Sequence, residues 1–345
     1  MRNIDTQAIM TYNPEKIQRI CLISLIGHIY FIMKIKEIKD GDLINNIFLT
    51  KEKRLSIAKN GSNYLSVRFV DNTGEIDAKL WDEADMYNKI FKKEDFVRVK
   101  GKVINYQGAK QIQIKQIERI DDSEVNISDY LQTSEKSTED MIRELKEKIA
   151  KIKDMHLTRL LSLFYEDTDF IELFKTAPAA KSNHHAYIGG LLQHTLEVAN
   201  LCEDVTKYYP EINTDLLITG AILHDIGKVH ELKYSKAFGY TDEGGLIGHI
   251  TIGVEMIAEK IRMIDGFPHK LEMLLKHMIL SHHGHYEYGS PKRPKILEAI
   301  MLYHMDEMNA KVDMFRSSID EDESERENWT AYNKFFERYL FKNYK

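Results

Sequence analysis

The pattern of hydrophobic and polar positions divides the chain into a front part with strand-like alternation and a back part with helical spacing. In the front part, four segments carry apolar residues at every second position, which predicts strands with one buried face. These segments are 64–71, 75–81, 95–106 and 110–120. We expect a further strand at roughly 45–58, and a short helix at 84–91 between the third and fourth strands.

Five strands in about 90 residues, with a helix between the third and the fourth, follow each other in the order that is typical of an OB-fold barrel. Such barrels bind single strands of nucleic acid through basic and aromatic side chains on an exposed face. The outward strand positions predict a face of this kind, formed by Tyr64, Arg68, Lys79, Trp81 and Tyr106. The alternative is that these are ordinary solvated positions and that Trp81 closes the bottom of the barrel.

The back part is predicted to be all-α. From Glu139 onward, apolar residues recur three and four positions apart, as expected of amphipathic helices. The polar, Ser/Thr-rich stretch before it indicates a linker, so the sequence predicts a multi-domain α+β protein. The expected divisions are an N-terminal extension (1–32), an OB-fold barrel (33–121), a linker (122–138), a helical bundle (139–320) and an acidic, helical C-terminal tail (321–345).

Composition argues against a membrane protein, because 30% of the residues are charged and 43% are hydrophobic. The apolar run at 21–33 is shorter than the roughly 20 residues of a membrane-spanning helix, and it lacks a signal-peptide cleavage pattern. It is either a buried element or, as we favour, translated upstream sequence before a start at Met33. The two cysteines, Cys21 and Cys202, lie far apart, which fits a reducing cytoplasm.

Charge is unevenly distributed along the chain. Residues 33–121 contain 18 Lys and Arg against 14 Asp and Glu, a net charge of +4, whereas residues 122–345 carry a net charge of −11. A mildly basic module on an acidic one favours a polyanion-binding domain attached to a second domain with another role.

The helical part places several ionisable residues within apolar segments or at their ends. They are His194, His224, Asp225, His249, His282, His283 and Asp306. An unpaired ionisable group in such a position is costly, whereas a divalent metal would supply the compensating charge. Bundles build metal sites from facing helices, and mixed nitrogen and oxygen ligands suit Mn²⁺, Fe²⁺ or Co²⁺. For any one histidine, the alternative is a hydrogen-bonded core residue.

With these residues in view, the chain resembles a known family. His194, the pair His224-Asp225 and Asp306 match the defining pattern of the HD-domain metal-dependent phosphohydrolases, and the further histidines match the subset that holds two metals. The stretch "APAAKSNHHAYIGGLLQHT" (177–195), together with the OB-like front part, is similar to the YhaM-type 3′→5′ exoribonucleases. The resemblance covers about residues 33–315.

The resemblance implies a cytoplasmic enzyme that degrades single-stranded RNA, with single-stranded DNA as a further substrate, from the 3′ end to nucleoside 5′-monophosphates. Metal-activated hydroxide would attack the phosphodiester, and Mn²⁺ is the favoured ion. One ion would be held by His194, His224 and Asp306, and the other by His249, His282 and His283. Asp225 is the natural bridge between them, because a carboxylate has two oxygens.

Several basic residues are candidates for phosphate contact. Lys228 follows Asp225 by one helical turn and would stabilise the scissile phosphate, unless it is a surface lysine. The others are Lys181, His184 and His185 before the first ligand helix, and Lys292 and Arg293 in the loop 284–294. In that loop Tyr286 or Tyr288 could stack on a terminal base. The alternative is that both segments are solvated connections.

The sequence is also compatible with two other functions. An HD domain could hydrolyse a nucleotide or a cyclic dinucleotide, although the segment after His282-His283 lacks the GYP signature of cyclic-di-GMP hydrolases. The chain could also be a non-catalytic adaptor that binds single-stranded nucleic acid. The complete set of metal ligands argues against the adaptor. The oligomeric state does not follow from these patterns.

Overall fold

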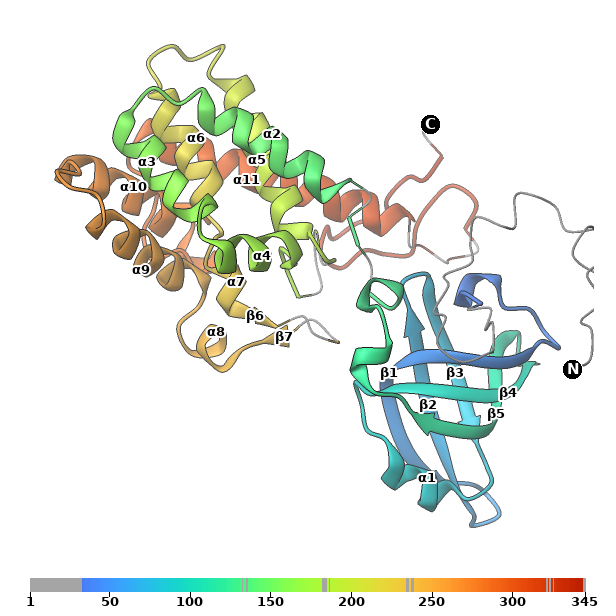
Figure 1. The fold of residues 1–345 in the computed structure, drawn as a ribbon. Coiled ribbons are helices and arrows are strands. Elements are labelled where there is room, and N and C mark those ends of the chain that lie inside the picture. Colours follow the sequence, from blue (N-terminus) through green and yellow to red (C-terminus); the bar gives the residue numbers. More distant parts are fainter. Residues whose placement is uncertain are drawn as a thin grey trace, which may run out of the picture. The chain divides into compact units, whose positions relative to one another are not determined.

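The computed structural model describes residues 33–343, apart from positions 132, 135, 182–184, 186, 234, 235, 237, 238, 321, 323 and 325. The N-terminal extension and the candidate phosphate contact His184 therefore lie outside the described residues. The chain divides into two compact units, with the boundary between Val125 and Asn126 (Figure 1).

The first unit is a closed five-stranded barrel with the strand order β1-β2-β3-β5-β4. Its elements are β1 (Leu43–Ile57), β2 (Asn63–Asp71), β3 (Gly74–Leu80), α1 (Ala84–Ile90), β4 (Phe96–Tyr106) and β5 (Ala109–Arg119). The strands β3 and β5 pair in parallel, and β1 closes the barrel by pairing with β4. The expected OB-fold order, with its helix between the third and fourth strands, is confirmed.

The alternation in the sequence corresponds to the two faces of the barrel wall. Leu65, Val67 and Phe69 point into the core, and Phe69 stacks on Phe48 at a centroid distance of 5.4 Å. Gly101 lies at a bulge in β4, where a Cβ would collide with the backbone of Gln113 in β5. The close approach of these two strands therefore requires glycine at this position.

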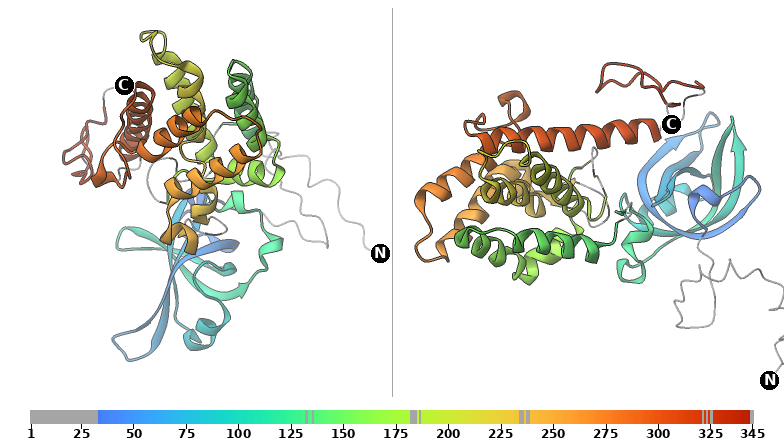
Figure 2. Two further views of the ribbon diagram at one scale, coloured as in Figure 1. Left: turned by 90° about the vertical axis from the view of Figure 1, so that its left-hand side faces the viewer. Right: turned by 90° about the horizontal axis from the view of Figure 1, so that it is seen from above.

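The second unit is a helical bundle, with one two-stranded sheet that the sequence did not indicate (Figures 1 and 2). Its helices are α2 (Thr138–Ala150), α3 (Met155–Tyr165), α4 (Thr168–Thr176), α5 (Gly190–Val205), α6 (Thr214–Leu223), α7 (Lys228–Glu231), α8 (Asp242–Leu246), α9 (His249–Arg262), α10 (His269–Ser281) and α11 (Leu297–Asp320). The sheet pairs β6 (Leu232–Lys233) with β7 (Gly239–Tyr240).

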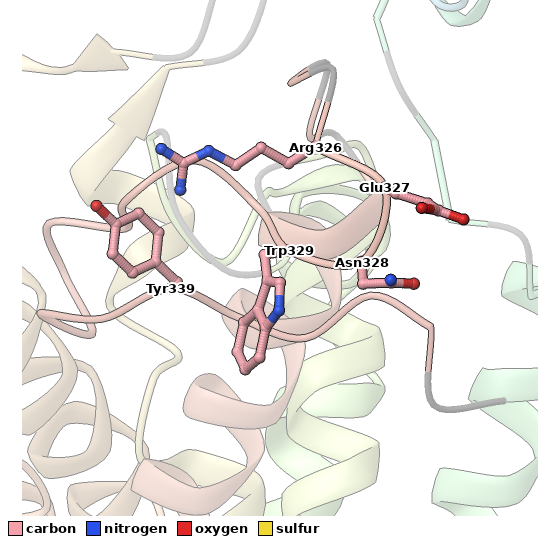
Figure 3. A pocket seen from close by; sticks show the side chains of 5 residues that line it. All are labelled: Arg326, Glu327, Asn328, Trp329 and Tyr339. Carbon is pink, nitrogen blue, oxygen red and sulfur yellow. The ribbon is translucent and has the colours of Figure 1, made fainter.

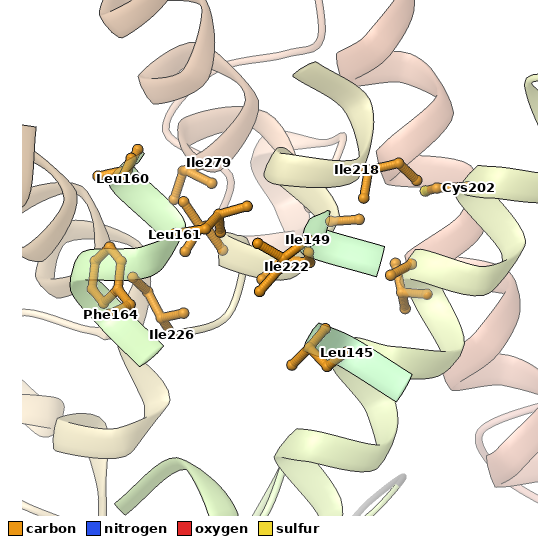
Figure 4. Close-up of a cluster of buried hydrophobic side chains, with 14 of the residues drawn as sticks. Leu145, Ile149, Leu160, Leu161, Phe164, Cys202, Ile218, Ile222, Ile226 and Ile279 are labelled. Carbon is orange, nitrogen blue, oxygen red and sulfur yellow. The ribbon is translucent and has the colours of Figure 1, made fainter. Parts of the chain in front are cut away.

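Helix α6 lies at the centre of the bundle. Asn213 caps its first turn, because its side chain accepts a hydrogen bond from the Leu216 N–H. Every residue from Leu216 to Leu223 is buried, and α6 contacts α5, α10 and α11. Ile222 packs in the core among side chains such as Leu145 and Ile279 (Figure 4). The C-terminal end of α6 therefore places the residues that follow it inside the unit.

The segments before and after the helical bundle differ from the linker and the helical tail that the sequence predicted. The segment before α2 contains two 3₁₀ turns, Asp122–Glu124 and Ile127–Asp129. After α11 ends at Asp320, the expected helical tail is not found in the described residues. Instead, the segment 326–343 folds back on itself, with bridges between Trp329 and Phe341 and between Asn333 and Arg338.

Among the residues that the structure describes, no helix is both long enough and apolar enough to cross a membrane.

Candidate metal centre

The seven residues predicted to bind metal come together in the helical unit, although they derive from five segments of the chain. His194 lies in α5 and Asp306 in α11. The pair His224-Asp225 directly follows α6, His249 is the first residue of α9, and the pair His282-His283 directly follows α10. Helical bundles build metal sites in this way, from side chains of facing helices that project toward one point.

The ligand atoms form two groups. In the first, one atom each of His194, His224 and Asp306 lies within 4.8 Å of the other two. The Nε2 atom of His194 is 3.2 Å from that of His224 and 3.1 Å from Oδ1 of Asp306. In the second, one ring nitrogen each of His249, His282 and His283 lies within 4.8 Å of the other two. This division is the one expected for two ions.

Asp225 lies between the two groups and turns one carboxylate oxygen toward each. Its Oδ2 is 3.5 Å from Nε2 of His194 and 3.3 Å from Nε2 of His224. Its Oδ1 is 3.5 Å from Nε2 of His249 and 3.6 Å from Nε2 of His282. This is the arrangement that a carboxylate bridging two ions requires.

Hydrogen bonds at Nδ1 orient all five imidazoles. The Nδ1···O pairs are His194–Asn309 Oδ1 (2.8 Å), His224–Ala221 O (2.8 Å), His249–Glu231 Oε1 (2.9 Å), His282–Ile279 O (2.8 Å) and His283–Tyr288 O (2.9 Å). A neutral imidazole that donates from Nδ1 keeps its lone pair on Nε2. Nε2 is the nitrogen that His194, His224, His249 and His282 turn toward Asp225, so the hydrogen bonds at Nδ1 favour the tautomer that metal binding needs.

The donor set fits a divalent transition metal. Oδ1 of Asp225 and the Nε2 atoms of His249 and His282 are buried and have no hydrogen-bond partner in the structure. Leaving such atoms unsatisfied is costly, and a cation among them would remove the cost. Nitrogen and oxygen donors without a thiolate favour Mn²⁺, Fe²⁺ or Co²⁺ over softer metals.

The two carboxylates of the site are held in their ionised form. Burial by itself would raise the pKa of Asp225, but the charges of Lys228 and His224 outweigh burial and hold that pKa well below its usual range. Burial likewise opposes ionisation of Asp306, whose pKa is nevertheless lowered, chiefly by its hydrogen bond with His194. Both residues therefore offer negative oxygens to a cation.

His194 and His283, one from each group, have pKa values shifted in opposite directions. Burial disfavours the charged form of His194, yet hydrogen bonds with Asp225 and Asp306 raise its pKa to about 9. In the second group, burial and the neighbouring imidazoles of His282 and His249 lower the pKa of His283 to about 3. The imidazole of His283 is thus neutral at pH 7, the form that metal binding requires.

Lys228 is buried rather than on the surface. It is the first residue of α7, and its Nζ lies 2.6 Å from Oδ2 of Asp225. Burial would lower the pKa of this ammonium group, but Asp225 outweighs burial and raises it. A fixed positive charge therefore lies beside the carboxylate that joins the two groups.

The other candidate phosphate contacts differ from one another in their burial and in their neighbours. His185 is buried, with its ring nitrogens 3.3 Å from Glu197 Oε2 and 3.0 Å from Asp313 Oδ2, which corrects the expectation of a phosphate contact at this position. Lys181 places its Nζ 5.7 Å from the ring centroid of Tyr240. Lys292 and Arg293 are exposed.

Two residues that hold the ligands were missed in the sequence. Glu231 accepts hydrogen bonds from both the backbone N–H and Nδ1 of His249, at 3.0 and 2.9 Å. Asn309 bonds His194 and donates from Nδ2 to Glu197 at 2.9 Å. Asn309 follows Asp306 by three positions, so helical spacing could have indicated that it shares the ligand face.

Gly227 explains how α9 reaches the site. A Cβ at this position would overlap the carbonyl oxygen of His249 and lie 2.7 Å from the backbone nitrogen of Gly253. The turn after α6 therefore packs directly against the first turn of α9, and this approach brings His249 to Asp225.

On the barrel, four of the five predicted strand-binding residues form one cluster. Tyr64 and Trp81 stack at a centroid distance of 4.6 Å, and Trp81 is 43% exposed, so it does not seal the barrel. Lys79 Nζ lies 5.5, 5.8 and 5.2 Å from the ring centroids of Tyr64, Trp81 and Tyr106. Arg68, the fifth, pairs with Asp77 at 2.9 Å.

Comparison with known proteins agrees with both units. Residues 191–311 match the family model described as the HD domain, and residues 49–120 match the OB-fold nucleic acid binding domain. Residues 125–211 match a model described as "Putative helicase". The chain thus contains an OB-type barrel followed by a helical region with an HD domain, the domain type of metal-dependent phosphohydrolases.

Two of the solved structures that are similar to this chain illustrate the extent of the likeness. The second OB-fold domain of replication protein A from Methanococcus maripaludis is 24% identical, with 26% of this chain and 96% of that chain covered and a TM-score of 0.23. The mitochondrial single-stranded DNA binding protein Rim1 from S. cerevisiae is 15% identical, with 24% and 96% covered and a TM-score of 0.22.

Replacing Gly227 with alanine should destabilise the helical unit by roughly 1–3 kcal/mol, because the added methyl group has no room beside α9. Thermal unfolding followed by circular dichroism measures the effect. Gly245→Ala is the matched control, since nothing lies within 4 Å of its Cβ position. Equal losses of stability in the two variants would contradict the close-approach argument.

Removing the Glu231 carboxylate should weaken metal binding, because His249 loses the partner that fixes its ring. For Glu231→Ala we expect an affinity for Mn²⁺ lower by roughly 10- to 100-fold in calorimetric titration. The exposed Glu243 provides the control variant Glu243→Ala. Unchanged Mn²⁺ affinity in Glu231→Ala would show that His249 needs no such partner.

Proposed function

We propose that this protein is a metal-dependent 3′→5′ exoribonuclease that degrades single-stranded RNA, and also single-stranded DNA, to nucleoside 5′-monophosphates. One observation carries the proposal. The two carboxylate oxygens of Asp225 face different groups, each made of three candidate metal ligands. A phosphodiesterase site with two metal ions needs a shared ligand in this position. The direction of degradation and the preference for RNA rest on the resemblance of residues 177–195 to the YhaM-type enzymes.

The chain's own residues have separable roles in this reaction. His194, His224 and Asp306 would hold one ion, and the three remaining histidines would hold the other. Asp225 would be shared between the two ions, for which Mn²⁺ is the favoured metal. Bound ions of this type neutralise phosphate charge and lower the pKa of a bound water. The hydrogen bonds at Nδ1 keep the rings in position throughout.

Lys228 supports the proposal as a source of positive charge. Its ammonium group stays protonated at neutral pH because Asp225 raises its pKa. From this position it holds the orientation of Asp225, and it can donate a hydrogen bond to a phosphate oxygen as negative charge develops in the transition state.

The barrel would supply the strand-binding surface. Tyr64, Trp81 and Tyr106 offer ring faces around the ammonium group of Lys79. Rings of this kind stack on unpaired bases of any sequence, while the lysine attracts the phosphates. The match of residues 49–120 to the OB-fold nucleic acid binding domain supports the same assignment.

A direct test incubates metal-free protein with 5′-labelled single-stranded RNA, with and without added Mn²⁺, and separates the products on a gel. We expect a descending ladder of labelled fragments with Mn²⁺ only. Asp225→Ala should abolish the ladder, because both groups lose their shared ligand, and should leave RNA binding largely intact. His230→Ala is the control, since His230 lies in the same segment but is exposed.

Three outcomes would overturn parts of the proposal. Near-normal degradation by Asp225→Ala would refute the metal-site assignment. Intact RNA beside hydrolysis of a nucleotide or cyclic dinucleotide would identify the alternative phosphohydrolase. RNA binding without turnover under any metal would identify a non-catalytic adaptor.

Trp81→Ala should weaken the binding of single-stranded RNA by roughly tenfold, because a stacking contact with one base is worth about 1–3 kcal/mol. Fluorescence anisotropy with a labelled oligonucleotide in EDTA measures binding without degradation. Trp81→Phe keeps an aromatic ring and should retain most of the affinity. Equal affinity of the alanine variant and the unsubstituted protein would remove Trp81 from the strand-binding surface.

A further inference from the structure

The segment 326–343, here called the C-terminal hairpin, presents aromatic rings on its surface. Its two arms are joined by backbone hydrogen bonds between Thr330 and Leu340 and between Asn333 and Arg338, and the side chain of Leu340 is buried. Its base is held where Lys342 pairs with Asp322 at 2.9 Å. The hairpin is therefore held together by its own backbone hydrogen bonds and joined to Asp322 at its base.

The rings of the hairpin contact each other but remain open to solvent. Trp329 meets Phe341 at a centroid distance of 5.1 Å, and Tyr332 meets Tyr339 at 5.3 Å, both edge to face. Edge-to-face pairs hold a ring in place while leaving one of its faces uncovered. Trp329 is 49% exposed, which is unusual for the largest apolar side chain without a binding role.

A pocket of about 490 Å³ opens on this surface, lined by Arg326, Glu327, Asn328, Trp329 and Tyr339 (Figure 3). This volume lies within the range of ligand-binding pockets, roughly 300–1,000 Å³. The Arg326 guanidinium lies 4.7 Å from the centroid of the Tyr339 ring. Figure 3 shows Arg326 extending toward Tyr339 above the ring of Trp329, so the pocket combines a cation with two aromatic surfaces.

The charge of the hairpin differs from that of its surroundings. Residues 326–343 contain four Lys and Arg against two Asp and Glu, a net charge of +2, within a C-terminal portion (122–345) whose net charge is −11. Positive charge beside exposed rings is the combination that binds single-stranded nucleic acid, through phosphates and stacked bases respectively. The same combination offers little to an apolar partner.

We propose that the C-terminal hairpin is a second binding surface for single-stranded RNA, separate from the barrel, on which an unpaired base stacks against Trp329 while Arg326 contacts a phosphate. The choice of RNA as ligand rests on the proposed function. Glu327 and Asn328 at the same pocket provide an acceptor and an amide that can hydrogen-bond the edge of a base.

The test uses the fact that the chain has two tryptophans, Trp81 and Trp329, one for each surface. Trp81→Phe leaves Trp329 as the sole indole, and Trp329→Phe leaves Trp81. Each full-length variant is titrated in EDTA with an oligouridylate of about 12 nucleotides while tryptophan emission is recorded. We expect saturable quenching of Trp329 in the first variant, independent of any catalysis.

A binding measurement by anisotropy accompanies the titration. Trp329→Ala should weaken oligouridylate binding by roughly tenfold, whereas Tyr208→Ala, which removes another exposed ring of the same unit, should not. Circular dichroism and thermal unfolding verify that each variant is folded. Trp329→Phe should bind nearly as well as the unsubstituted protein.

The outcomes separate this inference from the proposed function. Quenching of Trp81 but not of Trp329 overturns the hairpin as a binding surface and leaves the nuclease proposal standing. Quenching of Trp329 in a protein that shows no Mn²⁺-dependent degradation supports the hairpin and refutes the nuclease. A change of oligomeric state in Trp329→Ala, seen by sedimentation with unchanged oligouridylate affinity, would mean that the rings contact a second copy of the chain instead.

Discussion

The candidate active site depends on one buried carboxylate, that of Asp225. In an apolar bundle a negative oxygen is stable only where positive or hydrogen-bonding groups surround it. Here Lys228 lies against one oxygen, and imidazoles from four segments face the two oxygens. Since each oxygen faces a different group of ligands, the position of this one side chain determines the geometry of both groups.

The position of Asp225 depends in turn on the packing of α6. This helix is buried from Leu216 to its end at Leu223, the turn that follows it is also buried, and α5, α10 and α11 pack around it. Gly227 allows α9 to approach that turn more closely than a side chain would permit. The site is thus assembled by the same contacts that stabilise the bundle.

Much of this could be predicted because buried ionisable residues stand out in apolar segments. The pair His224-Asp225 and the isolated Asp306 would each be costly in a helix core unless they had partners, so their types and order pointed to one metal centre. The strand alternation likewise predicted which side chains fill the barrel, and it indicated the outward set that includes Trp81. These inferences depend on periodicity within one element, which the local chain determines.

Other features depended on contacts between elements that are distant in sequence. The order of residues implied the strands, the helices and the ligand types, and the resemblance to the HD-domain phosphohydrolases implied the division of the ligands into two groups. Only the folded chain decided that Glu231 holds His249, that His185 is buried between two carboxylates, and that residues 326–343 form a hairpin with exposed rings. The reason is physical: spacing along one element determines which face a residue occupies, but which groups meet across faces is determined by the packing of the whole domain.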